Sequence, residues 1–96
     1  MPHYISLVKW TDQGIKNVRE SPKRADQVAH LTEQLGGKMQ LFYTMGEYDL
    51  VAITEAKDDE TAMQLLLQLG TLGSVRTTTM KAWTPAQATK IIAKLQ

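Results

Sequence analysis

The segment KMQLFYTMGEYDLVAITE, residues 38–55, decides the fold of this chain. Its β-branched and aromatic residues predict two strands, 38–45 and 48–55. Gly46 stands between them at the first central position of a two-residue loop, which suits a type II′ hairpin turn and a positive φ. The segment is therefore expected to form a tight antiparallel hairpin.

The two faces of this hairpin are both substantially apolar. The turn predicts that Met45 faces Tyr48, Tyr43 faces Leu50 and Leu41 faces Ala52. Met39 falls on that same face, and the opposite face carries Phe42, Val51 and Ile53, with Gln40, Thr44 and Asp49 among them. A sheet with one solvated face alternates between apolar and polar residues. Each face of this sheet is therefore expected to be covered.

The flanking sequence adds strands and helices on both sides of the hairpin. Before the hairpin we predict a strand at 4–10, a helical turn after Thr11 and a helix from Ser21-Pro22 to Gly36-Gly37. After it we predict a helix at 62–69, which Asp58-Asp59-Glu60 opens and Gly70 and Gly73 break. A strand at 75–83 and a short C-terminal helix after Thr84-Pro85 complete the chain. This order is the split βαβ arrangement of the ferredoxin-like fold, an α+β class with a four-stranded antiparallel sheet. Since two helices cover only one face, a second copy of the chain is expected on the other, giving a dimeric α+β barrel.

Composition excludes several classes of function. The 96 residues predict a single domain, 1–96, and 43% hydrophobic with 22% charged residues is ordinary for a folded protein. A net charge of +1 argues against nucleic acid as a partner, and no apolar run is long enough to cross a membrane. The N-terminus lacks a signal-peptide pattern, so a cytoplasmic location is expected. The absence of cysteine removes disulfides, iron–sulfur clusters and thiolate chemistry.

Five short motifs, in order along the chain, carry a family resemblance. They are Thr11-Asp12-Gln13-Gly14, Ser21-Pro22-Lys23-Arg24, Gly46-Glu47-Tyr48-Asp49, Asp58-Asp59-Glu60 and Val75-Arg76-Thr77-Thr78-Thr79. Together they resemble the GYD-domain family, named for a glycine, tyrosine, aspartate signature, here with Glu47 inserted. The resemblance runs from Tyr4 to about Trp83. It implies a dimeric α+β barrel, and it does not indicate which biochemical activity the chain has.

Four residues are the candidates for binding a ligand: Tyr43, Tyr48, Asp49 and Arg76. Arg76 is a charged residue among threonine, valine and methionine, and Asp49 is its leading partner because arginine matches a carboxylate with two parallel hydrogen bonds. Neither His3 nor His30 has a second ligand at metal-binding spacing, and no phosphate-binding glycine loop occurs, so no metal and no cofactor are predicted.

Three functions remain open at this point. The first is a homo-oligomer that binds a small molecule in a barrel cavity. The second is a cofactor-free enzyme of oxygenase or isomerase type, with Asp49 as a base and Arg76 stabilising negative charge. The third is a structural or regulatory assembly module without a ligand.

Overall fold

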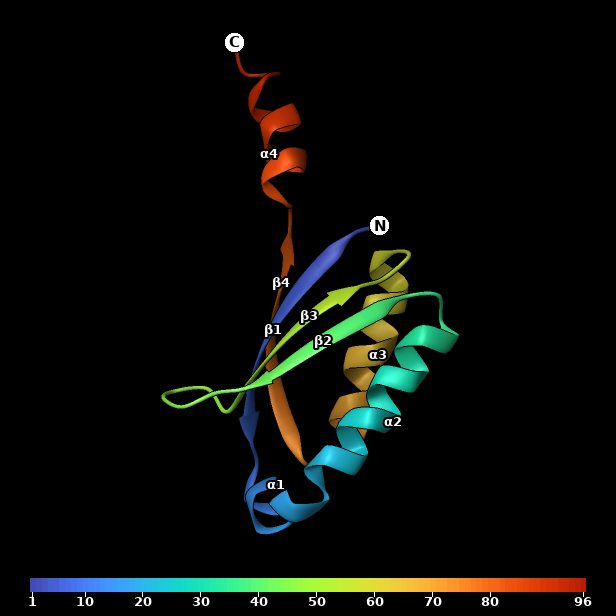
Figure 1. The fold of residues 1–96 in the computed structure, drawn as a ribbon, viewed down its shortest axis with the longest axis vertical. Coiled ribbons are helices and arrows are strands. Elements are labelled where there is room, and N and C mark those ends of the chain that lie inside the picture. Colours follow the sequence, from blue (N-terminus) through green and yellow to red (C-terminus); the bar gives the residue numbers. More distant parts are fainter.

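A four-stranded antiparallel sheet with two long helices on one side forms the body of the protein, and the computed structural model describes all 96 residues (Figure 1). In chain order the elements are β1 (His3–Trp10), α1 (Asp12–Lys16), the 3-10 turn η1 (Val18–Glu20), α2 (Ser21–Gln34), β2 (Lys38–Tyr43), β3 (Leu50–Glu55), α3 (Asp59–Thr71), β4 (Val75–Ala82) and α4 (Pro85–Ile92). The predicted α+β, ferredoxin-like arrangement is confirmed.

The strand order across the sheet is β2-β3-β1-β4, and every neighbouring pair is antiparallel. Tyr43 faces Leu50 and Leu41 faces Ala52, as the position of Gly46 predicted. The strand β4 lies at one edge. The chain thus begins in β1 at the centre of the sheet and returns beside it in β4.

The turn between β2 and β3 is wider than predicted. Six residues, 44–49, connect the strands, because β2 ends at Tyr43 and β3 begins at Leu50. Asp49 explains the difference: its backbone N–H donates to the Val8 carbonyl, and its carboxylate accepts a bond from the backbone N–H of Trp10. Both bonds hold Asp49 against β1. The positive φ predicted for Gly46 is confirmed at 115°.

Side-chain caps start three of the helices, as the sequence indicated. The hydroxyl of Thr11 accepts from the Gly14 N–H, the carboxylate of Asp58 accepts from the Thr61 N–H, and Thr84 forms a capping box with Gln87. Ser21 was expected to cap α2 in the same way, and this was wrong. The chain is already helical in η1, so Ser21 is the first residue of α2 and its hydroxyl bonds Tyr43 instead.

The ends of α2 and α3 differ from each other. Gly36 has a φ of 85° and follows α2 as the expected left-handed residue. Gly70 was expected to break α3, but it lies within the helix, which continues to Thr71. After α3, the first residue with a positive φ is Gly73, at 79°. Gly70 is tolerated inside the helix because a single glycine there costs only about 1 kcal/mol relative to alanine.

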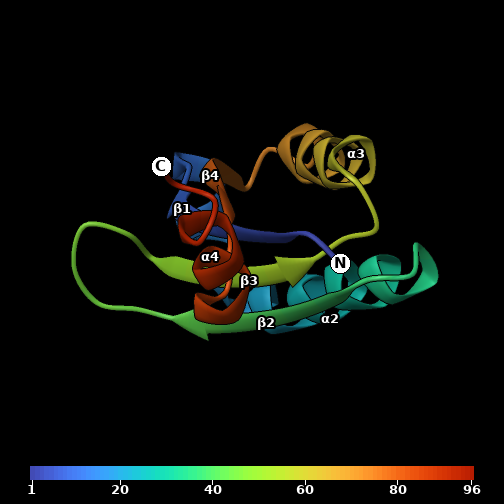
Figure 2. The same cartoon turned by 90° about the horizontal axis from the view of Figure 1, so that it is seen from above.

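The two long helices pack on opposite edges of the sheet. Helix α2 contacts β2, and α3 contacts β4. Seen from above, α2 and α3 are separated across the central strands (Figure 2). The body is thin, with principal extents of 52 × 31 × 17 Å, and only 14 of the 96 residues are buried. The core is therefore small for a chain of this length.

Helix α4 projects beyond the end of the sheet as a continuation of β4 (Figure 1). None of its residues is buried, and Ile91 and Ile92 are exposed. No helix of the chain is both long and apolar enough to cross a membrane.

Candidate functional site

A groove between α2 and α3 lies over the central strands of the sheet and encloses a cavity of about 110 Å³. The middle of its floor is formed by three small side chains, Ser6 in β1, Ala52 in β3 and Thr79 in β4, and larger strand residues such as Val8 and Leu50 lie beside them. Its walls are apolar, with Val28 on α2 facing Leu65 and other leucines on α3. Concave apolar sites with a few polar groups are the usual form of a small-molecule site.

Four of the hydroxyl groups that line this groove bond to another hydroxyl or to the backbone. Ser6 bonds Thr79 at 2.8 Å, Ser21 bonds the Tyr43 hydroxyl at 2.9 Å, and Thr32 donates to the Val28 carbonyl. Their polar atoms are satisfied without a ligand. The interior of the groove is thus apolar in effect, although hydroxyl-bearing residues line it.

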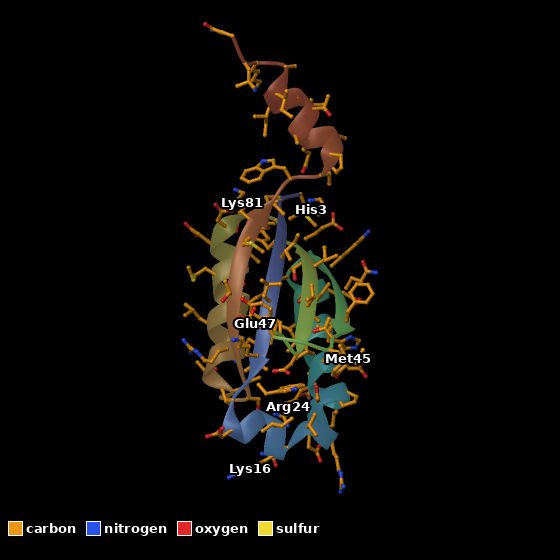
Figure 3. The ribbon with its side chains drawn as sticks, turned by 90° about the vertical axis from the view of Figure 1, so that its left-hand side faces the viewer. His3, Lys16, Arg24, Met45, Glu47 and Lys81 are labelled. Carbon is orange, nitrogen blue, oxygen red and sulfur yellow. The ribbon has the colours of Figure 1, made fainter.

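Arg24 is the one charged residue that lines the groove. Its guanidinium donates to the Ser74 hydroxyl and, at 2.9 Å, to the Asn17 carbonyl, and it forms no ion pair. The side chain is half-buried and lies at the end of the sheet near α1 (Figure 3). Because Arg24 comes from α2 and Ser74 directly precedes β4, their bond closes this end of the groove.

A second polar cluster holds the first turn of α3 on the sheet. Tyr4 lies on the groove side of β1 and its hydroxyl donates to the Asp59 carboxylate, which also pairs with Lys81 at 3.0 Å. Burial, together with this hydrogen bond and the nearby negative charge, raises the pKa of Tyr4 to about 12. The bonds from Tyr4 and Lys81 lower the pKa of Asp59. The Tyr4 hydroxyl therefore retains its proton and acts as a hydrogen-bond donor to Asp59.

The opposite face of the sheet is not covered by the chain. It presents Ile5 and Leu7 of β1, Phe42 of β2, Val51 and Ile53 of β3, and Met80 of β4, which we call the open face. Phe42 is 48% exposed, Met80 46% and Ile53 36%. Figure 3 views the sheet from this side, with Met45 and Glu47 on the projecting 44–49 loop. The expectation that both faces are apolar is confirmed.

The four residues predicted from sequence do not form one cluster. Tyr43 lies beside α2 and bonds Ser21, at the edge of the groove. Tyr48 lies in the 44–49 loop, with the Lys9 ammonium 5.2 Å from its ring centre. Arg76 is exposed on β4 and faces Lys9 across the strand pair. A ligand-binding role for these residues remains a prediction.

The expected ion pair between Asp49 and Arg76 is not formed. Asp49 bonds the backbone at Val8 and Trp10, on either side of Lys9, while Arg76 faces Lys9 from β4. Lys9 therefore lies between the two groups, and its own partner is Glu47 at 3.9 Å. The Asp49 carboxylate acts here as a backbone acceptor that anchors the loop.

Sequence reasoning missed Arg24 and Ser74 as site residues. Arg24 appears there only within the motif Ser21-Pro22-Lys23-Arg24, and Ser74 belongs to none of the five motifs. Fifty positions separate them, and no periodicity joins them. One signal was available: Ser6, Ala52 and Thr79 are small residues at strand positions where larger ones pack a core. No group of three or more metal-ligating side chains gathers anywhere in the chain.

The fold and the groove define a ferredoxin-like α+β protein with one covered and one open sheet face. The model of the GYD domain matches residues 4–92, so the chain belongs to the GYD-domain family. It is 34% identical over 84 residues to the glutamine synthetase and cystathionine beta-lyase binding protein of Thermus thermophilus, covering 85% of this chain and 88% of that protein.

A solved structure supports the fold. The crystal structure of the protein TTHA0845 from Thermus thermophilus superposes with a TM-score of 0.57 at 23% identity, covering 88% of this chain and 95% of that one. At this identity the likeness concerns the fold alone.

Proposed function

We propose that this GYD-domain protein is a homodimer that binds other proteins. The observation that carries the proposal is the large apolar surface that the chain itself leaves uncovered. Six apolar side chains form the open face, and burying one such side chain stabilises an assembly by about 1.5–3 kcal/mol. Exposed apolar surface of this extent, rimmed by charged residues, is typical of an interaction site.

The open face is the surface for a second copy. A two-fold axis places the same patch of both subunits in contact, so a flat apolar sheet is complementary to itself. The rim fits this arrangement, since His3 and Glu55 lie 3.6 Å apart at one end, and Lys9 with Glu47 at the other. Stacking two such faces gives the dimeric α+β barrel expected from the sequence.

Helix α4 is the element proposed to dock on a different protein. Its capping box starts the helix without help from the rest of the fold, and Ala88, Ile91 and Ile92 lie on one side of it. Amphipathic helices of this kind bind by inserting their apolar side into a groove of the partner. The position of α4 beyond the sheet leaves it accessible when the open face is occupied (Figure 1).

The kind of partner is suggested by the relative from Thermus thermophilus, whose name describes binding to two enzymes. We infer that this chain likewise binds a metabolic enzyme, with glutamine synthetase from the same organism as the first candidate. The 34% identity over most of both chains supports this transfer.

The test immobilises purified glutamine synthetase from the same organism and measures binding of the full chain and of a chain ending at Ala82. The full chain is expected to bind at micromolar concentration, and the shortened chain to lose binding while light scattering still gives the dimer mass. The variant Lys90→Ala, on the polar side of α4 and outside its capping box, is the matched control and should bind normally. Absence of binding by the full chain contradicts the enzyme-binding proposal. A monomeric shortened chain would instead place α4 in the homodimer.

A second candidate function, binding of a small molecule, is favoured by the groove between α2 and α3. The apolar cavity of about 110 Å³ with a single arginine at its end is the supporting observation. For comparison, a dry apolar cavity of roughly 150 Å³ holds benzene. Saturation of the groove with such a small aromatic molecule, followed by nuclear magnetic resonance, tests this candidate independently of the dimer.

A further inference from the structure

Arg24 is the single charged side chain that lines the groove between α2 and α3. We propose that the groove binds a small aromatic or branched aliphatic carboxylate, with the apolar part in the cavity and the carboxylate on the Arg24 guanidinium. This inference rests on the small-molecule candidate function above and names the ligand class for that site.

The hydrogen bonds of Arg24 leave it able to accept a ligand. A guanidinium has five N–H donors, and the contacts to Ser74 and Asn17 use only two of the side-chain nitrogens. Both acceptors are neutral, and none of the ion pairs of the chain involves Arg24. The half-buried guanidinium is therefore available to bind a carboxylate. Hydrogen bonds between a guanidinium and a carboxylate are stronger than its present bonds to neutral oxygens.

The geometry of the groove sets the size and polarity of the ligand. A cavity of about 110 Å³ is smaller than the roughly 150 Å³ that encloses benzene, so it holds a short branched chain or one ring that partly protrudes from the groove, and not a nucleotide or a lipid. The hydroxyls of Ser6, Thr79 and Ser21 already have partners, so the interior offers few hydrogen bonds to a polar ligand. An uncharged sugar or an amino acid with a second charge would leave polar groups unmatched.

Arg24 is also positioned by the fold. Its two bonds join α2 to the residue before β4 and to the end of α1, so the guanidinium is held at one end of the groove (Figure 3). A preorganised arginine loses less side-chain entropy on binding than a solvated one. Arg19, on the exposed turn η1, has the same charge without this placement.

The experiment titrates phenylacetate and toluene into the full chain and follows amide signals by nuclear magnetic resonance. Phenylacetate is expected to bind in the millimolar range or tighter, and at least tenfold more tightly than toluene. Arg24→Gln should weaken phenylacetate binding at least tenfold and change toluene binding less than twofold. The control Arg19→Gln should change neither, which separates a direct contact from the general effect of net charge.

Two more variants keep the test decisive if Arg24→Gln unfolds the chain. Ser74→Ala removes the bridge but keeps the guanidinium, so phenylacetate binding should persist. Ala52→Leu fills the floor of the cavity and should abolish binding of both probes. Toluene binding without preference for phenylacetate overturns the ligand class while the cavity stands. Binding of neither probe overturns both the ligand class and the small-molecule function.

Discussion

The two faces of the sheet differ in the size of the side chains that form their central rows. Beneath its own helices the sheet carries the row Ser6, Ala52 and Thr79 across three strands. One residue along, the open face carries Ile5, Ile53 and Met80 on the same three strands. In this central row the larger apolar side chains lie on the open face, whereas elsewhere the covered face carries large residues such as Val8, Leu41 and Leu50.

This difference explains both the groove and the proposed dimer. The small side chains of the central row beneath α2 and α3 leave a cavity where a filled core would be expected. Such a cavity is unusual, since a native interior has few voids larger than a water molecule. Large side chains on the open face gain stability only when another surface covers them. The proposed ligand site and the proposed dimer interface thus lie on opposite faces of the sheet.

The largest expected effect comes from placing a charge on the open face. Ile53→Lys would bury an unpaired ammonium in the proposed dimer interface, so the dimer dissociation constant should rise at least about 100-fold. Sedimentation equilibrium measures this constant. Leu67→Lys, on an exposed position of α3, is the matched control and should leave the dimer intact. Equal dissociation constants for Ile53→Lys and the unaltered chain would contradict the assignment of this face.

Filling the groove is expected to be tolerated, whereas filling the packed part of the same face is not. Ala52→Leu adds three carbons where a cavity stands, so the free energy of unfolding should change by less than about 1.5 kcal/mol. Ala56, 1% exposed and packed with Tyr4 and Ala62, has no such space, and Ala56→Leu should cost about 1–3 kcal/mol. Urea unfolding compares them. Equal losses would show that the groove closes in solution.

The 44–49 loop on the open side depends on Gly46. Its φ of 115° is a conformation that L residues avoid, so Gly46→Val should cost about 1–3 kcal/mol of stability. A Cβ there meets nothing within 4 Å, so the cost is conformational alone. Gly70→Ala, inside α3 and equally uncrowded, should instead stabilise by about 0.5–1 kcal/mol. An unchanged melting temperature for Gly46→Val would contradict the loop conformation.

The smallest effect concerns the bond that holds α3 on the covered face. Tyr4→Phe removes the hydrogen bond to Asp59 and should cost about 1 kcal/mol at neutral pH. The pKa of Tyr4 is raised to about 12 from 10.0, so its folded-state advantage is complete below pH 10 and decreases as the pH rises toward 12. The stability difference between the two chains should therefore shrink over that interval in urea unfolding. A difference independent of pH would show that Tyr4 does not hold its proton as described.

Local signals predicted the strands, their register and most helix starts. Residues that satisfy their bonds nearby were placed well: Thr11, Asp58 and Thr84 cap helices as expected because each bonds a backbone N–H three residues away. Register followed from Gly46, since a loop centred there pairs Tyr43 with Leu50 whether it has two residues or six.

Distant contacts decided what the sequence could not predict. The carboxylate of Asp49 bonds Trp10, 39 positions away, and this contact both widened the turn and removed the expected partner of Arg76. Arg24 reaches Ser74 only because α2 and β4 meet at one end of the sheet. The residue type at a single position does not indicate such a distant contact. The small residues Ser6, Ala52 and Thr79, by contrast, were a signal in the sequence for the groove.

The molar mass of the unaltered chain in solution is the most direct test of the difference between the two faces. Light scattering at micromolar concentration is predicted to give twice the chain mass of 10.8 kDa, because the proposed dimer covers the open face with a second copy. A mass of 10.8 kDa under the same conditions would mean that the larger side chains of the open face remain in water, and it would contradict the account.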